Sequence, residues 1–454
     1  MGTFEKIYDH SPIFFQNLMV SVKGYLNNRE RYGKAYDEYR VFLRDYDTWS
    51  LEKKRQHQQE ELIAFVRFAY ENSAFYREFY QDVDIDAIRT AEDLKALPVL
   101  EKEMLRQRME EIVIDTGEPC WHANTGGTTG KSLQVTMTHR DMMRRMAMLD
   151  HFKAKVGFEH RKMRRATFNG KHIVPPSQTK KVFWRYNAAC KQKIYSSFHI
   201  TEENMRYYVE DLNRFKPQAL DGFFTSMCDI AGYIERHQIP LTFRPVAIFP
   251  TSETLTDEGR ALLERVFGCK VYNQYASSEG APFVNECPEQ HLHVMLASGV
   301  FETYGDHDEV LVTSFTTHAT PLIRYRIGDR MIFDGDGVCP CGDPSPLVKA
   351  IEGRKLDFLY TAQGAKINAG NVSNLLKYLP NVVIHSQFVQ TVKEEVTLLL
   401  EVDKTLFKPE HEELIRQEFT HTFGRDTRLV VQYVKEIPRE VSGKYKMIKN
   451  LVEE

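Results

Sequence analysis

A short glycine-rich stretch limits the folds open to this chain of 454 residues. Residues 124–138 read NTGGTTGKSLQVTMT, where hydroxyls and backbone amides can line a concave anion-binding loop. A Walker-type loop needs glycine five residues before Gly130 and a helix after Lys131. Thr125 occupies the first position, and the residues that follow alternate between apolar and polar as in a strand. We therefore expect a hairpin loop that closes over phosphates, with an ordinary glycine-rich surface turn as the alternative.

Composition limits the compartment and the partners. The formal net charge of −3 implies no global attraction to nucleic acid or to a membrane. The most apolar N-terminal run, IFFQNLMVSV, is interrupted by Gln16 and Asn17 and has no signal-peptide cleavage site. Seven cysteines, few and odd in number, indicate a reducing compartment without disulfides. We expect a cytoplasmic protein with no membrane span.

One segment is strongly basic, although the chain as a whole is nearly neutral. Residues 161–200 contain ten Lys or Arg and no Asp or Glu. Four aromatic residues are interleaved with them: Phe183, Trp184, Tyr186 and Tyr195. This segment predicts a landing surface for a polyanion such as the phosphates of coenzyme A, a nucleotide sugar or RNA. A solvated basic face is the alternative.

The pattern of apolar residues indicates an α/β protein. The first hundred residues have helical spacing, as in EELIAFVRFAYENSAFYREFY. From about residue 135 to residue 354, β-rich runs alternate with helical ones, which is typical of a sheet with crossover helices. After a boundary near Gly353, short strands such as EVTLLLEV alternate with helices such as EHEELIRQEFTHTF. That segment predicts a small α+β domain.

One strand end carries candidate ligand groups. Residues 271–280 read VYNQYASSEG, in which an apolar strand would deliver Tyr275, Ser278 and Glu279 to its carboxyl end. Ligands of open α/β sheets bind at such ends, so the ring would stack on a base and the carboxylate would hold Mg²⁺. An ordinary strand end with a polar turn is the alternative.

Three more positions carry chemistry suited to a nucleotide. Asp329 in PLIRYRIGD would bridge two ribose hydroxyls. Arg354 in IEGRKLDF would reach the nucleotide at the domain junction, and Lys444 in IPREVSGKYK would supply positive charge to a pentavalent phosphate. The alternatives are a turn aspartate, a linker arginine and a surface lysine.

Cysteine and histidine spacing predicts a metal centre. Cys339 and Cys341 form a C-x-C pair, and Cys287, His291 and His293 lie about 45 residues earlier. These groups offer enough sulfur and nitrogen donors for one closed Cys3His zinc site, which is structural because it leaves no open position. We favour His293 over His291 as the fourth ligand. Buried free cysteines are the alternative.

Taken in order, TGGTTGK, YASSE, YRIGD, GR and SGK resemble the core motifs of the adenylate-forming superfamily. Within it the chain resembles the phenylacetate-CoA ligase family and its capsule-biosynthesis-associated relatives, through FKPQALDGFFTSMCDIAGYI and the cysteine–histidine cluster. The resemblance covers nearly the whole chain. It implies a large N-terminal α/β domain over residues 1–353, with a helical extension over about 1–95 and a zinc insert over about 285–342. A mobile α+β domain over 354–454 would follow.

The resemblance implies a two-step reaction with ATP, Mg²⁺ and structural zinc. A carboxylic acid would become an acyl-adenylate with release of pyrophosphate, and coenzyme A would then take the acyl group. The phosphate loop would comprise Thr125, Gly126, Gly127, Thr128, Thr129, Gly130 and Lys131. The rest of the nucleotide site would comprise Ser252, Glu253, Asn273, Gln274, Tyr275, Ser278, Asp329 and Arg354. Lys444, Glu279 and Thr128 would be catalytic, and Phe223, Phe224, Ala281 and Pro282 would line the acyl pocket.

Two positions depart from the family pattern. Leu356 stands where the hinge often has Asp, with Asp357 next, and Ala276 stands where Gly is usual. The sequence also leaves other functions open. The acceptor would be coenzyme A or another anionic compound such as a glycan precursor, or AMP would go to a phosphorylated cofactor. A zinc-stabilised nucleic-acid-binding protein and a scaffold are alternatives of another class. Nucleic acid is not the expected partner, and a homodimer is left open.

Overall fold

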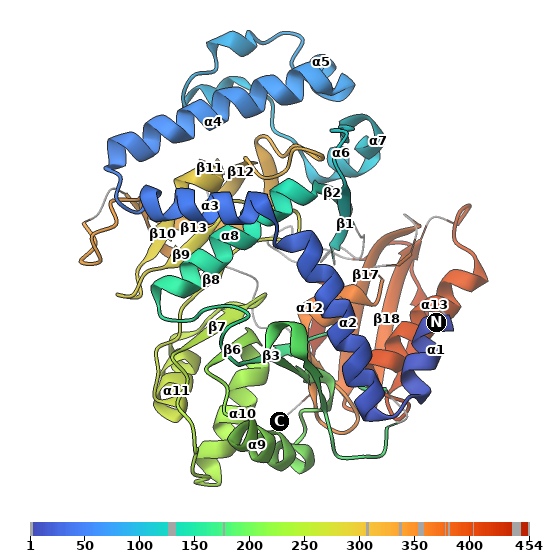
Figure 1. Cartoon of the computed structure of the whole chain (residues 1–454). Coiled ribbons are helices and arrows are strands. Elements are labelled where there is room, and N and C mark those ends of the chain that lie inside the picture. The colour runs from blue at the N-terminus through green and yellow to red at the C-terminus, as the bar shows by residue number, and fades with distance from the viewer. Residues whose placement is uncertain are drawn as a thin grey trace.

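The structure is a computed structural model. It describes residues 3–125, 133–175, 178–305, 308–335, 338–352, 358–376, 378–379, 382–402, 404–437 and 446–452. Across these ranges, no helix is long and apolar enough to cross a membrane. The chain is a mixed α/β protein whose sheets are flanked by helices, as the sequence predicts (Figure 1).

Helices fill the N-terminal part, as the periodicity predicts. They are α1 (Thr3–His10), α2 (Ile13–Arg31), α3 (Lys34–Tyr46), α4 (Leu51–Asn72), α5 (Ala74–Phe79), α6 (Lys102–Gln107) and α7 (Met109–Ile112), with short 3-10 turns at Ile85–Ala87 and Asp93–Ala96. The apolar run that begins at residue 60 is divided at Ser73. Its hydroxyl accepts the backbone N–H of Tyr76 and caps α5, because a cap satisfies an N–H that lacks a helical partner.

The glycine-rich stretch joins two strands, so the predicted hairpin is confirmed. Strands β1 (Cys120–Thr125) and β2 (Leu133–Thr138) are antiparallel, with Thr125 opposite Leu133. The alternation in β2 buries Leu133 and Val135 on one face of the strand. Thr138 then caps α8 (His139–Lys155) through its side chain. The loop residues 126–132 lie outside the described residues.

A five-stranded sheet forms the crossover unit that the sequence predicts. Its order is β4-β5-β3-β6-β7, and it is parallel except for the edge strand β4. The strands are β3 (Arg165–Asn169), β4 (Trp184–Asn187), β5 (Gln192–Ser196), β6 (Ala219–Phe223) and β7 (Ala247–Thr251). Helices α9 (Glu202–Phe215), α10 (Phe224–Arg236) and α11 (Asp257–Phe267) cover one side (Figure 1). Their apolar faces pack with Phe168, Leu220 and Ile248 of the strands.

An antiparallel sheet of seven strands lies beside the crossover unit, in the order β11-β12-β13-β14-β10-β9-β8. The strands are β8 (Gln274–Tyr275), β9 (Val284–Glu286), β10 (Leu292–Val294), β11 (Gly299–Tyr304), β12 (Glu309–Ser314), β13 (Tyr325–Gly335) and β14 (Leu347–Glu352). The buried side chains of α4 and α5, Phe65 and Tyr76 among them, belong to the same apolar core as those of the sheet, so the helical N-terminal part is integral to the fold.

The C-terminal part has its own sheet and core. A hairpin of β15 (Phe358–Tyr360) and β16 (Lys366–Asn368) leads into α12 (Ala369–Asn374). The sheet β19-β18-β17-β20 follows, built from β17 (Val383–Val392), β18 (Glu395–Val402), β19 (Arg428–Tyr433) and β20 (Ile448–Asn450). Helix α13 (Pro409–Phe423) packs Ile415 and Phe419 into the core of this part. The boundary near Gly353 lies outside the described residues, so the two-domain division stays a prediction.

Candidate active site and metal centre

Two residues predicted to bind a nucleotide meet across the seven-stranded sheet. Tyr275 lies on β8 and Asp329 on β13, and the Tyr275 hydroxyl donates a hydrogen bond of 2.8 Å to a carboxylate oxygen of Asp329. A carboxylate has several acceptor positions, so it can accept more than one hydrogen bond at a time. An aromatic ring can stack on the base of a nucleoside, and a carboxylate beside it can accept hydrogen bonds from the ribose hydroxyls.

A buried arginine positions the loop that follows β8. The Nη1 of Arg145, on α8, donates to the carbonyl oxygens of Gly280 and Ala281 at 2.9 and 3.0 Å and to the hydroxyl of Thr316 at 3.0 Å. Burial lowers the pKa of Arg145 to about 10, so the guanidinium remains charged at neutral pH. Charge-assisted bonds of this kind fix the loop that carries Glu279.

The carboxylate assigned to magnesium has a cationic neighbour. Lys102, the first residue of α6, donates to Glu279 Oε1 at 3.2 Å, and the Glu279 side chain is 12% exposed. A divalent cation bound at Glu279 would share the carboxylate with this ammonium group or displace it. Lys102 therefore belongs to the candidate site, although nothing in the sequence around it singles it out.

Glu253 links two distant parts of the chain. Its carboxylate accepts the backbone N–H of Thr225 at 2.7 Å, the Thr225 hydroxyl at 2.9 Å and the amide of Asn368 at 2.6 Å. Burial raises the pKa of Glu253, and the donors from Thr225 oppose that shift. Ser252 precedes it with φ of 68° and is exposed, which turns the chain sharply after β7.

The residues before Tyr275 are held by their neighbours. Gln274 Nε2 donates to the carbonyl of Pro250 at 3.2 Å, which ties β8 to β7. The backbone N–H of Asn273 donates to Glu286 at 2.7 Å. Ser278 is exposed on the loop that follows the strand. The strand ends that carry the predicted nucleotide residues are thus held side by side.

The predicted acyl-pocket residues are closely packed. Phe224 is 2% exposed and belongs to the core of the five-stranded sheet, whereas Phe223 ends β6 and lies opposite Thr251 of β7. Ala281 is fully buried and Pro282 is buried beside Gly299. Their role in an acyl pocket stays a prediction.

Several predicted site residues lie outside the described residues. They are Gly126, Gly127, Thr128, Thr129, Gly130, Lys131, Arg354 and Lys444, together with the hinge positions Leu356 and Asp357. The backbone of Thr125 is described as the last residue of β1. The roles of these residues remain proposals.

The four predicted zinc ligands converge. One ligand atom from each of Cys287, His293, Cys339 and Cys341 lies within 4.8 Å of the others. The Cys287 and Cys339 sulfurs are 3.7 Å apart, and Cys341 Sγ is 3.5 Å from His293 Nε2. A tetrahedral zinc with Zn–S bonds of about 2.3 Å requires sulfurs about 3.8 Å apart. The geometry therefore fits zinc.

Outer contacts favour His293 as the nitrogen ligand. Its Nδ1 lies 3.1 Å from the carbonyl of Ser345, which would accept that N–H and leave Nε2 to face Cys341. His291 is exposed, although its Nδ1 lies 3.3 Å from Cys339 Sγ. Fully buried Lys54 of α4 donates to Asp343 at 2.7 Å, and the backbone N–H of Asp343 donates to Cys341 Sγ. Helix α4 thus supports the metal loop.

Comparison with solved structures gives the class. Over 89% of this chain and 91% of the other, the structure matches 2-hydroxyisobutyryl-CoA ligase in its postadenylation state, with a TM-score of 0.56 and 16% identity. The same ligase in its thioesterification state, with its acyl-AMP and CoA, gives a TM-score of 0.56 and 17% identity over 90% and 91% of the two chains. The protein therefore has the fold of the AMP-forming acid–thiol ligases.

Sequence comparison gives the family. The chain is 38% identical to protein CapK of Staphylococcus aureus over 96% of its own length and 97% of that protein. A family model described as the CapK C-terminal domain matches residues 359–451. The chain is also 24% identical to phenylacetate-coenzyme A ligase of Thermus thermophilus, over 83% of this chain and 88% of that one. The chain belongs to the CapK family, the capsule-associated branch of the adenylate-forming superfamily, as its motifs predict.

Sequence reasoning missed three residues that support the site: Lys102, Arg145 and Asn368. Arg145 and Lys102 lie in helices whose pattern marks them as ordinary charged positions. Asn368 caps α12 and contacts Glu253 across more than a hundred residues. Only long-range packing brings these groups to the site, so no local signal could have identified them.

Proposed function

We propose that this protein activates a carboxylic acid with ATP as an acyl-adenylate, releases pyrophosphate and transfers the acyl group to the thiol of coenzyme A. The observation that carries the proposal is the hydrogen bond of 2.8 Å between Tyr275 and Asp329, within the fold of the AMP-forming acid–thiol ligases. The similarity to phenylacetate-coenzyme A ligase of Thermus thermophilus supports the same class of reaction.

The chain would contribute charge and orientation. Attack of a carboxylate on the α-phosphate brings two anions together, so cations and hydrogen-bond donors must lower their repulsion. Mg²⁺·ATP would supply the activated phosphate. We assign Glu279 to the metal and Asp329 to the ribose, and the loop 125–131 to the outer phosphates. Lys444 would place a positive charge at the transition state.

Structural zinc is part of the proposal. Cys287, His293, Cys339 and Cys341 would form a closed site that stabilises the fold and takes no part in the chemistry. A role in polysaccharide biosynthesis is also part of the proposal, and a glycan precursor is the alternative acceptor. A cytoplasmic location and the lack of nucleic-acid binding also remain predictions, and a homodimer stays an open alternative.

ATP–pyrophosphate exchange tests the first step. We would assay aryl, fatty, hydroxy and amino acids in turn, and we expect one class to stimulate exchange. Lys444→Ala should lower the exchange rate by roughly 10² or more if its charge stabilises the transition state. The matched control is Lys435→Ala, which removes an exposed lysine nearby in the sequence and should leave exchange unchanged.

A second assay separates the two steps. Lys444→Ala should still transfer the acyl group from a preformed acyl-adenylate to coenzyme A. If the natural acceptor is a glycan precursor, neither wild type nor variant should form the thioester with coenzyme A. Loss of both steps would contradict the proposed role of Lys444. Exchange that needs no acid would indicate AMP transfer to a phosphate, and ATP binding without any exchange would overturn the ligase proposal.

A further inference from the structure

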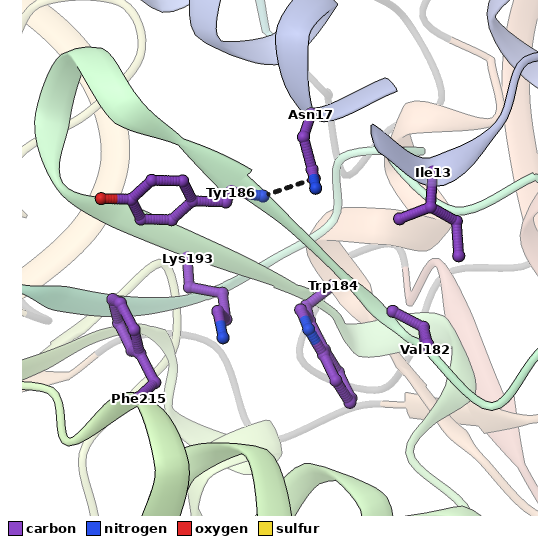
Figure 2. Close-up of a pocket in the computed structure, with 7 residues that line it drawn as sticks. All are labelled: Ile13, Asn17, Val182, Trp184, Tyr186, Lys193 and Phe215. Atoms are coloured by element: carbon purple, nitrogen blue, oxygen red, sulfur yellow. Dashed lines mark hydrogen bonds between the residues drawn. The ribbon is translucent and has the colours of Figure 1, made fainter. Parts of the chain in front are cut away.

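Helix α2 packs on the molecule through its polar side. Gln16 Oε1 accepts from fully buried Arg185 at 2.6 Å, and Asn17 Oδ1 accepts the backbone N–H of Tyr186 at 2.9 Å (Figure 2). Further along the helix, Asn28 donates to the carbonyl of Ala189 at 3.2 Å. The hydrogen-bonding side chains of α2 therefore face the protein, the reverse of an ordinary surface helix.

The same side of α2 meets the sheet at close range. A side chain at Gly24 would come within 2.3 Å of Asn187 Oδ1, so the helix backbone lies directly on the end of β4. Nearer its start, Ile13 and Asn17 line a cavity of about 370 Å³, whose aromatic wall includes Trp184 and Phe215 (Figure 2). Contacts to β4 thus fix which face of α2 points away from the protein.

The outward face of α2 is an exposed apolar stripe. Its members and their exposed fractions are Phe14 (74%), Phe15 (39%), Leu18 (54%), Val22 (51%), Tyr25 (62%) and Leu26 (49%). At 100° per residue these positions fall within an arc of about 120°, and they extend about 18 Å along the helix. Six large apolar side chains on one helix face form a contiguous patch, which marks an interaction surface. Figure 1 shows α2 crossing the front of the molecule.

Basic residues lie on α2 and beside the turn that it contacts. Between Asp9 and Glu30 the chain has no acidic residue, and exposed Lys23 and Arg29 lie on α2 itself. Exposed Lys191 follows the turn at Ala188–Cys190 that Asn28 contacts. None of these three cations forms an ion pair with a described residue. Lys191 donates to the carbonyl oxygen of Lys162 at 3.0 Å, which does not neutralise its charge.

The charge decides between two occupants of the stripe. In a symmetric dimer, each copy would present the same apolar stripe and the same cations to its partner, so like charges would repel at the edge of the interface. An anionic bilayer offers acyl chains for the stripe and phosphates for the cations. We propose that α2 docks this protein on the surface of an anionic lipid bilayer, lying in the plane of the interface. This proposal does not depend on the proposed chemistry.

Vesicle flotation tests the proposal. The full chain should float with vesicles of phosphatidylglycerol and phosphatidylcholine in equal parts at low salt, and not with phosphatidylcholine alone. Phe14→Ser combined with Leu18→Ser should lower the partition coefficient by about a hundredfold, since each side chain gives up much of its transfer free energy. The matched control is Val41→Ser with Leu406→Ser, two exposed apolar residues elsewhere that are 57% and 53% exposed.

A second pair of variants tests the charges. Lys23→Gln with Lys191→Gln should lower the partition coefficient roughly 25-fold, about fivefold per lysine at an anionic surface. The control pair is Lys404→Gln with Lys435→Gln, both exposed in the C-terminal part. Unchanged thermal unfolding of the variants would show that each still folds.

Three results would overturn the proposal. One is wild-type protein that stays with the buffer in the presence of the anionic vesicles. Another is a partition coefficient that is the same for wild type and for the Phe14→Ser and Leu18→Ser double variant. The third is a wild-type dimer in sedimentation velocity that the Phe14→Ser and Leu18→Ser double variant does not form, when neither protein floats with vesicles. That result would assign the stripe to a second copy of the chain.

Discussion

At the scale of single residues, the candidate metal centre depends on side chains that are distant in sequence. Burial raises the pKa of Asp343, but the Lys54 ammonium and the hydrogen bonds from Ser345 lower it more, so that pKa lies well below its usual range. The Asp343 carboxylate accepts the backbone N–H of Ser345 at 3.0 Å, and the backbone N–H of Asp343 donates to Cys341 Sγ at 3.4 Å. The spacing of the cysteines predicts the ligands, but nothing local predicts a lysine from α4 behind them.

We expect Cys339→Ser to lower bound zinc from about one equivalent to well below one, because a hydroxyl is a much poorer zinc ligand than a thiolate. The unfolding temperature should fall as well, since metal binding stabilises the folded state. Metal analysis by plasma mass spectrometry and a thermal melt measure the two effects. Cys190→Ser, at a buried cysteine outside the cluster, is the control and should keep its zinc. A zinc content near zero in the purified wild-type protein would contradict the prediction.

At the scale of elements, the crossover sheet depends on one close approach of strands. Gly222 on β6 has φ of 120°, and a side chain there would lie 1.8 Å from the carbonyl oxygen of Phe168 on β3. These two residues pair in parallel register. The glycine of FKPQALDGFF is therefore required by the packing of two strands as well as by its own backbone angle.

We expect Gly222→Ala to destabilise the protein by about 3 kcal/mol, which corresponds to a fall of roughly 3 °C in melting temperature for a chain of this length. The cost combines an unfavourable φ with a contact that neither backbone can relieve. Gly232→Ala in α10 is the matched control. Its new methyl group would meet only the flexible end of Arg236 at 3.3 Å, and alanine favours a helix, so stability should hold or rise. A Gly222 variant as stable as that control would show the strand contact to be unimportant.

At the scale of the whole molecule, the C-terminal part meets the crossover sheet through polar and aromatic contacts. Lys366 pairs with Asp229 at 3.1 Å, in addition to the bond from Asn368 to Glu253. The ring of His172 stacks on His421 of α13, with centroids 3.8 Å apart, and on Phe198 at 4.5 Å. Polar junctions of this type are easier to separate than a shared apolar core.

The junction should be sensitive to acid. Burial, with smaller contributions from His421 and His199, lowers the pKa of His172 to about 3, against about 6.5 in an unfolded chain. The unfolded state therefore binds the proton first. Stability from this group is complete above about pH 6.5 and is lost as the pH falls from there toward 3, by about 1 kcal/mol between pH 7.5 and 5.5.

We expect His172→Phe to reduce the loss of stability between these two pH values, because the ring stack remains while the titrating group is gone. Chemical denaturation at pH 7.5 and 5.5 measures the difference. His237→Phe, at an exposed histidine, should leave the pH dependence unchanged. Equal pH dependence in wild type and His172→Phe would refute a role for this histidine.

Local patterns in the sequence are enough to predict the local elements and the ligand types of the candidate metal site. Alternation in LQVTMT predicted β2, the run of strands and helices predicted the crossover sheet, and the spacing of Cys287, Cys339 and Cys341 predicted the metal cluster. These features have a short period or a fixed ligand chemistry, so neighbouring residues are enough to specify them.

Which distant groups meet depends on the packing of the whole chain. The bond from Tyr275 to Asp329 spans 54 residues, and the bond from Asn368 to Glu253 spans 115. The inward polar face of α2 follows from its contacts with residues 185–189, more than 150 positions away. Such pairings depend on how complete elements pack, because burial and hydrogen bonding are satisfied for the whole chain at once and not within any one segment.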